Sequence, residues 1–424
     1  MRRYIIFILV VLAFSCQGSN MKQGKDAEAL PEVYSETMSN LIGFFDAHAY
    51  DPEIGAYYSE LDNTGTVLSG KIYNVAISRL VYGLSYSSRY FPENLEKAKS
   101  AGAFQLENLV GTDSIGPYFR SFTEDGIADA STHLDIWQQA YGLCGLTELY
   151  RNAPDQELLT RIHSLHDAFI LRFRDVENGG FYGNYSLENG QISGSKSLQS
   201  LMYPITAYMA NLWSVDSANR KKYEPMILEN IRIAGDKAWD KETGWVNVRF
   251  DDSWKVCESE DAEKPCFMVA PGHNFQLASV LLRTGNWDYI SKAEREDFEK
   301  TGLEIIAASL NQPIFYGTDI SNGFVSEINP LTNEISDDRK TWWQHCEAII
   351  ALSLCDGKYD KEARLLEDFY FGSFPDFENG GEFFYVNKDN EPITSELKGS
   401  MGKSAYHTIE MIRFLMERQA KTLQ

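Results

Sequence analysis

Three of the seven histidines stand in glycine or aromatic contexts, and they are the first candidates for proton-transfer chemistry. His273 follows a Pro-Gly pair, His345 comes two residues after a pair of tryptophans, and His407 follows a tyrosine. An imidazole titrates near pH 6.5, so it can accept or donate a proton at neutral pH without large tuning. The remaining histidines carry no comparable signal and are His48, His133, His163 and His166.

The composition indicates a sugar rather than a nucleic acid as the ligand. Aromatic residues make up 13% of the 424 residues, which exceeds the needs of a plain core and suits a ligand that stacks on rings. The chain has 39 Lys and Arg against 61 Asp and Glu, a formal charge of −22. Such a charge repels phosphate backbones, so we expect no nucleic-acid partner.

A repeat of about 60 residues sets the expected architecture. Six turns pair a glycine with a nearby aromatic residue, and their glycines are Gly55, Gly116, Gly180, Gly244, Gly323 and Gly381. The segments between them follow the three-four apolar spacing of amphipathic helices, for example Leu143, Leu146 and Leu149. One repeat therefore holds two helices of about 15 residues.

An amphipathic helical pair cannot bury its apolar face alone, so neighbouring pairs must stack. Six hairpins closing on themselves predict an all-α (α/α)6 barrel with short β-hairpin turns. An open solenoid is the alternative, although solenoids have shorter repeats and polar caps. Closure leaves a bowl at one end of the barrel, where the ionisable and aromatic residues would form a site.

The first residues read as an export signal. Arg2 and Arg3 precede an apolar run over 4–14, which is too short to span a bilayer. Residues 12–16 resemble the lipobox of bacterial lipoproteins, in which Cys16 would carry the lipid. We therefore expect a signal peptide over 1–15, a flexible tether over 16–30 and a single barrel over 31–424, in a periplasmic or cell-surface lipoprotein. A free secreted protein is the alternative.

The other cysteines divide into two kinds. Cys257 and Cys266 lie nine residues apart in an acidic loop and could form a disulfide in an oxidising compartment. Cys144, Cys346 and Cys355 lie in apolar helical patterns and are expected to be buried thiols. No Cys-x-x-Cys pair is present, so a cysteine zinc site is not expected.

Five motifs occur in order between about residue 50 and the C-terminus. They are 71–82 with its Arg79, 135–141, the Pro-Gly-His run ending at His273, 340–347 with its Lys-x-Trp-Trp-x-His-x-Glu pattern, and 380–407. Taken together they resemble the N-acylglucosamine 2-epimerase family, which includes cellobiose 2-epimerases and mannose isomerases. The resemblance implies an isomerase that acts on a mono- or disaccharide.

The resemblance also implies roles for particular residues. Inverting a centre beside a carbonyl requires two bases on opposite sides of the substrate, and these would be His273 and His407. Arg79 would stabilise the oxygen of the enediolate intermediate. The other residues expected to contact substrate are Tyr141, Gln276, Trp342, Trp343, His345, Glu347 and Glu410.

Two of these positions depart from the family pattern. Gln276 stands where the family usually has Glu, and Glu410 stands where it usually has Arg. Residues three apart share a helix face, so Glu410 should neighbour His407 and Gln276 should neighbour His273. We therefore hypothesise that Glu410 raises the pKa of His407 while His273 stays less basic. A third departure is the absence over 196–208 of the His-x-x-Glu-Ala pattern that cellobiose epimerases carry.

Each assignment has a structural alternative. His273 could cap a helix, His407 could be a core histidine, and Arg79 could pair with a buried carboxylate. His345 could line the site or orient its neighbours from behind. Adjacent tryptophans cannot share a helix face, so one of Trp342 and Trp343 should pack in the core.

Two rival functions remain at this stage. The barrel also hosts glycoside hydrolases and lyases, whose two carboxylates could come from Asp135, Asp376, Glu378 and Glu382. A non-catalytic sugar-binding lipoprotein is the other reading. No dinucleotide or metal motif is present, so we expect no cofactor, a small saccharide as the partner, and a membrane contact only through Cys16. A homodimer remains open.

Overall fold

The structure is a computed structural model that describes residues 30–259, 261, 264–317 and 320–422. The expected signal peptide, Cys16 and nearly all of the expected tether lie outside the described residues. Among the helices of these ranges, none is long and apolar enough to cross a membrane.

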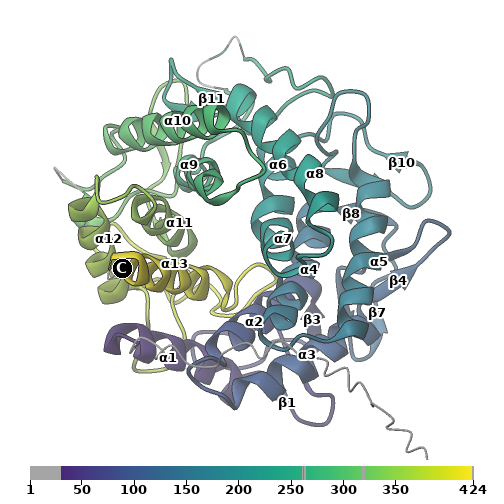
Figure 1. Cartoon of the computed structure of the whole chain (residues 1–424). Helices are drawn as coiled ribbons and strands as arrows, with labels where there is room; N and C mark the ends of the chain where they lie inside the picture. Colours follow the sequence, from purple (N-terminus) through teal and green to yellow (C-terminus); the bar gives the residue numbers. More distant parts are fainter. Residues whose placement is uncertain (1–29, 260, 262–263, 318–319, 423–424) are drawn as a thin grey trace, which may run out of the picture.

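Two concentric rings of helices form the predicted (α/α)6 barrel (Figure 1). The inner ring consists of α2 (Asn74–Ser87), α4 (Ile136–Asn152), α6 (Leu198–Pro204) continued by η1 (Ile205–Met209) and α7 (Ala210–Val215), α9 (Gly272–Arg283), α11 (Trp342–Ser353) and α13 (Tyr406–Thr422). The outer ring consists of α1 (Glu32–His48), α3 (Asn94–Asn108), α5 (Gln156–Phe173), α8 (Arg220–Ile233) continued by η2 (Ala234–Ala238), α10 (Lys292–Leu310) and α12 (Asp360–Ser373). Helix α13 packs on α2, which closes the ring and excludes the open solenoid.

The burial of the two rings explains why the sequence forms them. All residues of α2 are buried, as are nearly all those of α11, because an inner helix packs against its neighbours and against its outer partner. The outer helices bury one stripe only, such as Leu159, Ile162 and Leu165 on α5. This single-sided burial is the amphipathic pattern that the sequence showed most clearly.

Short antiparallel strands connect the helices. They are β1 (Tyr50–Asp51), β2 (Ala56–Tyr57), β3 (Lys71–Tyr73), β4 (Val110–Thr112), β5 (Pro117–Phe119), β6 (Phe122–Glu124), β7 (Ile127–Ala128), β8 (His133–Asp135), β9 (Asn184–Ser186), β10 (Gly190–Gln191), β11 (Trp239–Asp240), β12 (Trp245–Val246), β13 (Glu327–Ile328), β14 (Ile335–Asp337), β15 (Lys340–Thr341) and β16 (Tyr385–Val386). The sheets β3-β6-β7 and β10-β9-β8 have three strands, and the others have two. The short 3-10 helices η3 (Thr284–Asn286) and η4 (Ile320–Asn322) complete the described elements.

The glycines of the six predicted turns all have positive φ angles. At Gly180 the φ is 69°, and a Cβ atom would come within 2.5 Å of the Trp254 ring. Only glycine adopts this conformation readily and leaves room for the ring, which explains why the turn has glycine at this position. The repeat seen in the sequence is therefore a repeat of one backbone turn.

Each of two loops of the barrel contains a buried lysine–aspartate ion pair. Lys196 Nζ lies 2.7 Å from Asp175 Oδ2, and Lys398 Nζ lies 2.6 Å from Asp376 Oδ2. Each aspartate also accepts backbone N–H groups of its own Asp-x-Glu-Asn-Gly-Gly turn. These charges are buried but fully partnered, which fixes the loops.

The structure joins Cys257 to Cys266 in a disulfide with a Cα–Cα distance of 6.1 Å. This bond closes the loop that follows β12 and precedes α9. The thiols of Cys144, Cys346 and Cys355 are free and buried, as their apolar contexts suggested.

Candidate active site

The starts of the inner helices form one end of the barrel, and strands hold several of them there. Strand β3 leads directly into α2, β8 into α4 and β15 into α11. Asp135 accepts the backbone N–H of Gln138 at 3.2 Å and so caps α4. The first turns of six inner helices therefore face a common region.

His407, near the start of α13, is held by a carboxylate from the neighbouring helix. Its Nδ1 lies 3.1 Å from Oε1 of Glu347 on α11, and both side chains are more than nine-tenths buried. Burial lowers the pKa of His407 below 6.5, whereas the hydrogen bond and charge of Glu347 act in the opposite direction. The pair can therefore hold a proton inside the barrel.

His273, in the first turn of α9, has no such partner. Its Nδ1 is buried and has no hydrogen-bond partner among the described residues. Desolvation lowers the pKa of His273 to about 4, and the more distant charge of Glu347 offsets this only in part. At neutral pH His273 is thus an uncharged imidazole that can accept a proton.

Trp343 brings the two histidines together. Its ring centroid lies 5.4 Å from that of His273 and 6.0 Å from that of His407. The chain separates these histidines by 134 positions, yet both rings contact one indole. The structure therefore places them at a single site, where they can flank one small ligand.

Arg79 on α2 supplies the positive charge of the site. Its guanidinium lies over the Tyr141 ring at 4.1 Å and the Tyr406 ring at 5.4 Å, and Nη1 donates to the carbonyl of Gly402. Nε is buried without a partner among the described residues. The charge of Arg79 also lowers the pKa of His407, so the two groups are close enough to act on one substrate.

The two tryptophans divide their roles as the sequence suggested. Trp342 is only 3% exposed and packs edge-on against Phe384, with Lys403 Nζ 3.9 Å from its ring centroid. Trp343 is half-buried and contacts both histidines. Trp342 is therefore the core residue of the pair.

His345 has both ring nitrogens occupied by the backbone. Nδ1 lies 2.6 Å from the Thr341 carbonyl, Nε2 accepts the N–H of Phe324 at 3.1 Å, and the ring stacks on Phe324. Burial lowers the pKa of His345 to about 3. The structure places this imidazole behind the site, where it anchors α11 to the loop before β13.

Glu410 does not neighbour His407, and the predicted pairing is wrong. The carboxylate of Glu410 accepts hydrogen bonds from Tyr82 and from Arg413, the latter at 3.0 Å, and lies 3.7 Å from Arg283. The acidic partner of His407 is Glu347, and the pKa of His407 is lowered rather than raised. Two residues three apart on a helix point in similar directions, but their positions along the helix axis differ by about 4.5 Å. Their side chains therefore need not contact each other.

Gln276 lies one turn after His273 on α9 and is 2% exposed. Its Oε1 has no hydrogen-bond partner among the described residues. Together with His273 Nδ1 and Arg79 Nε, it is one of several unpaired polar atoms on the inner ring. Buried polar groups are normally paired, so each of these atoms is free to accept or donate a hydrogen bond to a polar ligand.

Of the four carboxylates of the hydrolase alternative, three are committed elsewhere and one is exposed to solvent. Asp376 pairs with Lys398, and Glu382 binds Lys403, Tyr370 and Thr408. Asp135 caps α4, and Glu378 is exposed in a turn. No two of them are arranged as a free acid and base, which removes the physical case for hydrolysis. Among the described residues no group of three His, Cys, Asp or Glu could hold a metal ion.

A polar cavity of about 470 Å³ adjoins Arg79. Trp137 and Tyr203 form its aromatic wall, and Asp135, Asn184 and Gln199 are among its polar residues. Trp137 lies 5.6 Å from the Arg79 guanidinium, and Tyr203 contacts Tyr141 at 5.6 Å. Trp137 and Tyr203 were not predicted as site residues from the sequence, although Trp137 stands four residues before Tyr141 on the same helix face.

The fold and this site define a carbohydrate-converting enzyme of the epimerase and isomerase class. Residues 55–411 match the N-acylglucosamine 2-epimerase family, and the chain belongs to that family. The resemblance found in the motifs is thereby confirmed.

Individual relatives cover nearly the whole chain. The N-acylglucosamine 2-epimerase of Bos taurus is 22% identical over 94% of this chain and 95% of its own length. The cellobiose 2-epimerase of Ruminococcus albus is 23% identical over 92% and 98%. The structure of a D-mannose isomerase superposes with a TM-score of 0.77 at 15% identity, over 92% of this chain and 100% of that chain.

Glycoside hydrolases resemble the fold more distantly. An α-mannanase of Bacteroides thetaiotaomicron has a TM-score of 0.62 at 12% identity, over 92% of this chain and 97% of that chain. This likeness shows a shared barrel and no more.

Proposed function

We propose that this protein epimerises or isomerises a saccharide by proton transfer at the carbon next to the carbonyl, with His273 and His407 as the two bases. The observation that carries the proposal is the contact of both imidazoles with Trp343, one paired with a carboxylate and the other unpaired. Two bases of unequal proton affinity on one ligand are what such a reaction requires.

The chemistry follows from the environments of the groups. Neutral His273 takes the C2 proton of the open-chain sugar, and the electron pair moves to the carbonyl oxygen to give an enediolate. Arg79 stabilises the negative oxygen. His407, protonated with the help of Glu347, returns a proton to the opposite face of C2 in an epimerisation, and the carbonyl at C1 forms again. In an isomerisation one of the bases returns the proton to C1 instead, while the proton of the O2 hydroxyl passes to O1 and the carbonyl forms at C2. The reverse reaction exchanges the two roles.

The cavity beside Arg79 bears on the size of the substrate. Its polar rim and the indole of Trp137 suit a second sugar ring, because sugars present both hydroxyls and an apolar C–H face. The relatives named above include an N-acylglucosamine 2-epimerase, named for a monosaccharide derivative, and a cellobiose 2-epimerase, named for a disaccharide. We therefore propose that the substrate is a monosaccharide or a disaccharide, and the assay below includes both.

To test the two-base proposal, the protein is incubated in heavy water with N-acetylglucosamine, mannose, glucose and cellobiose. NMR should show deuterium at C2 of at least one sugar, together with a new epimer or ketose. Release of a shorter sugar without label would establish hydrolysis instead. Binding without label or turnover would establish a sugar-binding protein.

Removing the charge of Glu347 should shift the pH dependence of the reaction. Glu347 favours the protonated form of His407, so Glu347→Gln lowers the pKa of His407 further below 6.5. The alkaline limb of the kcat profile, where His407 loses the proton that it donates, moves to lower pH. Proton donation by His407 weakens, and kcat near pH 7.5 falls about tenfold for each unit of pKa lost.

Glu410→Gln is the matched control for this prediction, because it makes the same change on the glutamate that lies beside Arg283 and Arg413. Its alkaline limb should coincide with that of the unmodified protein. A shift of the alkaline limb in Glu410→Gln and none in Glu347→Gln would contradict the assignment of the proton-holding pair.

We also propose that the protein is exported and held at the membrane through a lipid on Cys16. Arg2, Arg3 and the apolar run over 4–14 support export, and the disulfide of Cys257 and Cys266 suits an oxidising compartment. Metabolic labelling with a palmitate analogue should mark the intact protein and fail to mark Cys16→Ser.

A further inference from the structure

A second cavity lies at the other end of the inner ring, where the helices finish rather than start. It measures about 190 Å³ and is lined from α2, α4, η1, α7, α9, η3 and α13. Its polar wall contains Arg151, Asn211, Ser214, Arg283, Glu410 and Arg413. Ten residues separate His273 from Arg283 along α9, which places the cavity about 15 Å from the histidines by helix rise.

Arg283 at this cavity makes no hydrogen bond to any residue that the structure describes. Its side chain is only 12% exposed, yet it donates to no acceptor among the described residues, and Nε is buried. Its nearest carboxylate oxygen, Oε1 of Glu410, is 3.7 Å away, and it lies 4.2 Å over the ring of Phe414. Of the five N–H donors of this guanidinium, the one on Nε is buried and unpartnered among the described residues, and leaving a donor unpaired away from water is costly.

The neighbours of Arg283 are already occupied. Arg151 donates to Glu148, Asn211 and Ser214. Glu410 accepts from Arg413 and Tyr82. The cluster as a whole contains the guanidiniums of Arg89, Arg151, Arg283 and Arg413 against the carboxylates of Glu148, Glu410 and Glu417. Four positive charges face three negative ones, a local surplus of one in a chain of net charge −22.

We propose that this cavity binds a small oxyanion, a carboxylate or phosphate group, on the guanidinium of Arg283. The planar fork of arginine binds such groups through two parallel hydrogen bonds. Trp287 and Phe414 provide apolar wall for the body of the ligand, and the exposed Asn286 and Glu417 stand at the mouth. A cavity of 150 Å³ holds benzene, so this one suits a ligand up to about one sugar ring.

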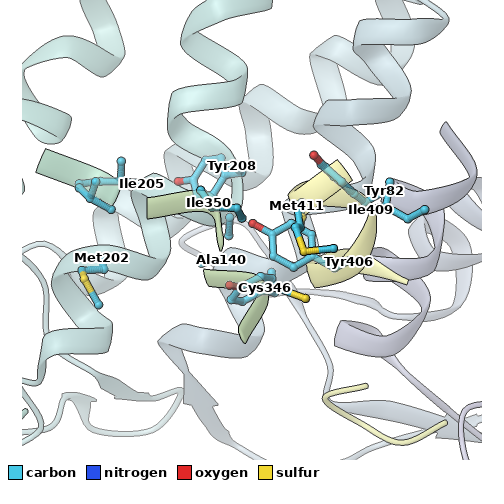
Figure 2. Packing of buried hydrophobic residues seen from close by; sticks show 14 of the residues in the cluster. Tyr82, Ala140, Met202, Ile205, Tyr208, Cys346, Ile350, Tyr406, Ile409 and Met411 are labelled. Carbon is cyan, nitrogen blue, oxygen red and sulfur yellow. The ribbon is translucent and has the colours of Figure 1, made fainter. Parts of the chain in front are cut away.

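Three tyrosine rings separate the anion from the substrate. Tyr141 beside Arg79 contacts Tyr406 at 5.5 Å, Tyr406 contacts Tyr82 at 4.9 Å, and the Tyr82 hydroxyl donates to Glu410. Figure 2 shows Tyr82 and Tyr406 among the buried side chains that the inner helices contribute to this layer. The anion site is therefore distinct from the catalytic site, although α9 and α13 contribute to both.

Titration calorimetry with inorganic phosphate and with glucuronate tests the proposal, and it does not depend on any sugar being turned over. At least one of the two should bind with a Kd of about 1 mM or lower. Arg283→Gln should weaken that binding at least tenfold, and Arg283→Lys, which keeps the charge but loses the fork, should fall between. Preference for phosphate or for glucuronate identifies the source of the oxyanion.

The matched control is Arg232→Gln, which removes the same charge from an exposed ion pair on α8. It should bind the anion within twofold of the unmodified protein. The proposal is overturned if neither anion binds at millimolar concentration, or if Arg283→Gln and Arg283→Lys, verified as folded by circular dichroism, bind as tightly as the unmodified chain.

Discussion

Replacing either His273 or His407 by asparagine should lower kcat about 10²–10⁴-fold, the usual contribution of a positioned acid or base. Asparagine keeps a polar side chain of similar reach but cannot take up a proton. Both histidines contact Trp343, so each variant leaves the other base and the binding surface in place. The measurement is the rate of deuterium incorporation at C2 in heavy water.

The two variants should also differ from one another. Each base removes the proton from one epimer, so each variant should abolish the first exchange step for a different epimer. His48→Asn, at the exposed end of α1 far from the inner ring, is the control and should exchange at the rate of the unmodified protein. If both histidine variants exchanged normally, the two-base mechanism would be refuted.

Arg79→Lys should lower kcat about 10²–10³-fold, the range measured when a donor to a developing oxyanion is lost. Lysine keeps the positive charge but loses the planar fork that lies over Tyr141 and donates to Gly402. Arg79→Met also removes the charge that lowers the pKa of His407, so that pKa rises. The alkaline limb of the profile should therefore move to higher pH in Arg79→Met and stay in place in Arg79→Lys.

Arg220→Lys offers a matched control for this pair of variants. Arg220 also lies over an aromatic ring, that of Trp213 at 4.7 Å, and donates to a backbone carbonyl at 3.0 Å, but it stands at the start of α8 in the outer ring. Its kcat should be unchanged. An equal loss in Arg220→Lys and Arg79→Lys would mean that the loss reflects stability rather than the enediolate.

Much of the fold could be predicted because the same local feature recurs six times. Each of the six glycines named from the sequence has a positive φ, and the segments between them are the expected helical pairs. Turn chemistry and apolar spacing are local properties, so a single sequence displays them. The strands were harder to place, because pairs such as β15 with β16 join residues 44 and 46 positions apart.

The residues of the candidate site could be predicted from the sequence, but the contacts between them could not. Sequence context pointed to His273, His407 and Arg79, and the structure brings together the first turns of α9 and α13 and the second turn of α2, where these residues lie. It also pointed to His345, whose two ring nitrogens turn out to bind the backbone. Aromatic neighbours in the sequence accompany both an imidazole that faces the site and one that anchors a loop behind it. They therefore do not distinguish the two roles.

The six-fold helical repeat, the positions of its turns and the histidines in the first turns of two inner helices could be read from the chain, because each is encoded within a few adjacent residues. The folded arrangement was needed to show that Glu347 rather than Glu410 pairs with His407, and that Arg283 makes no hydrogen bond among the described residues. Burial and proximity set these proton affinities and charges, and closure of the ring brings α11 against α13 across 60 positions of chain.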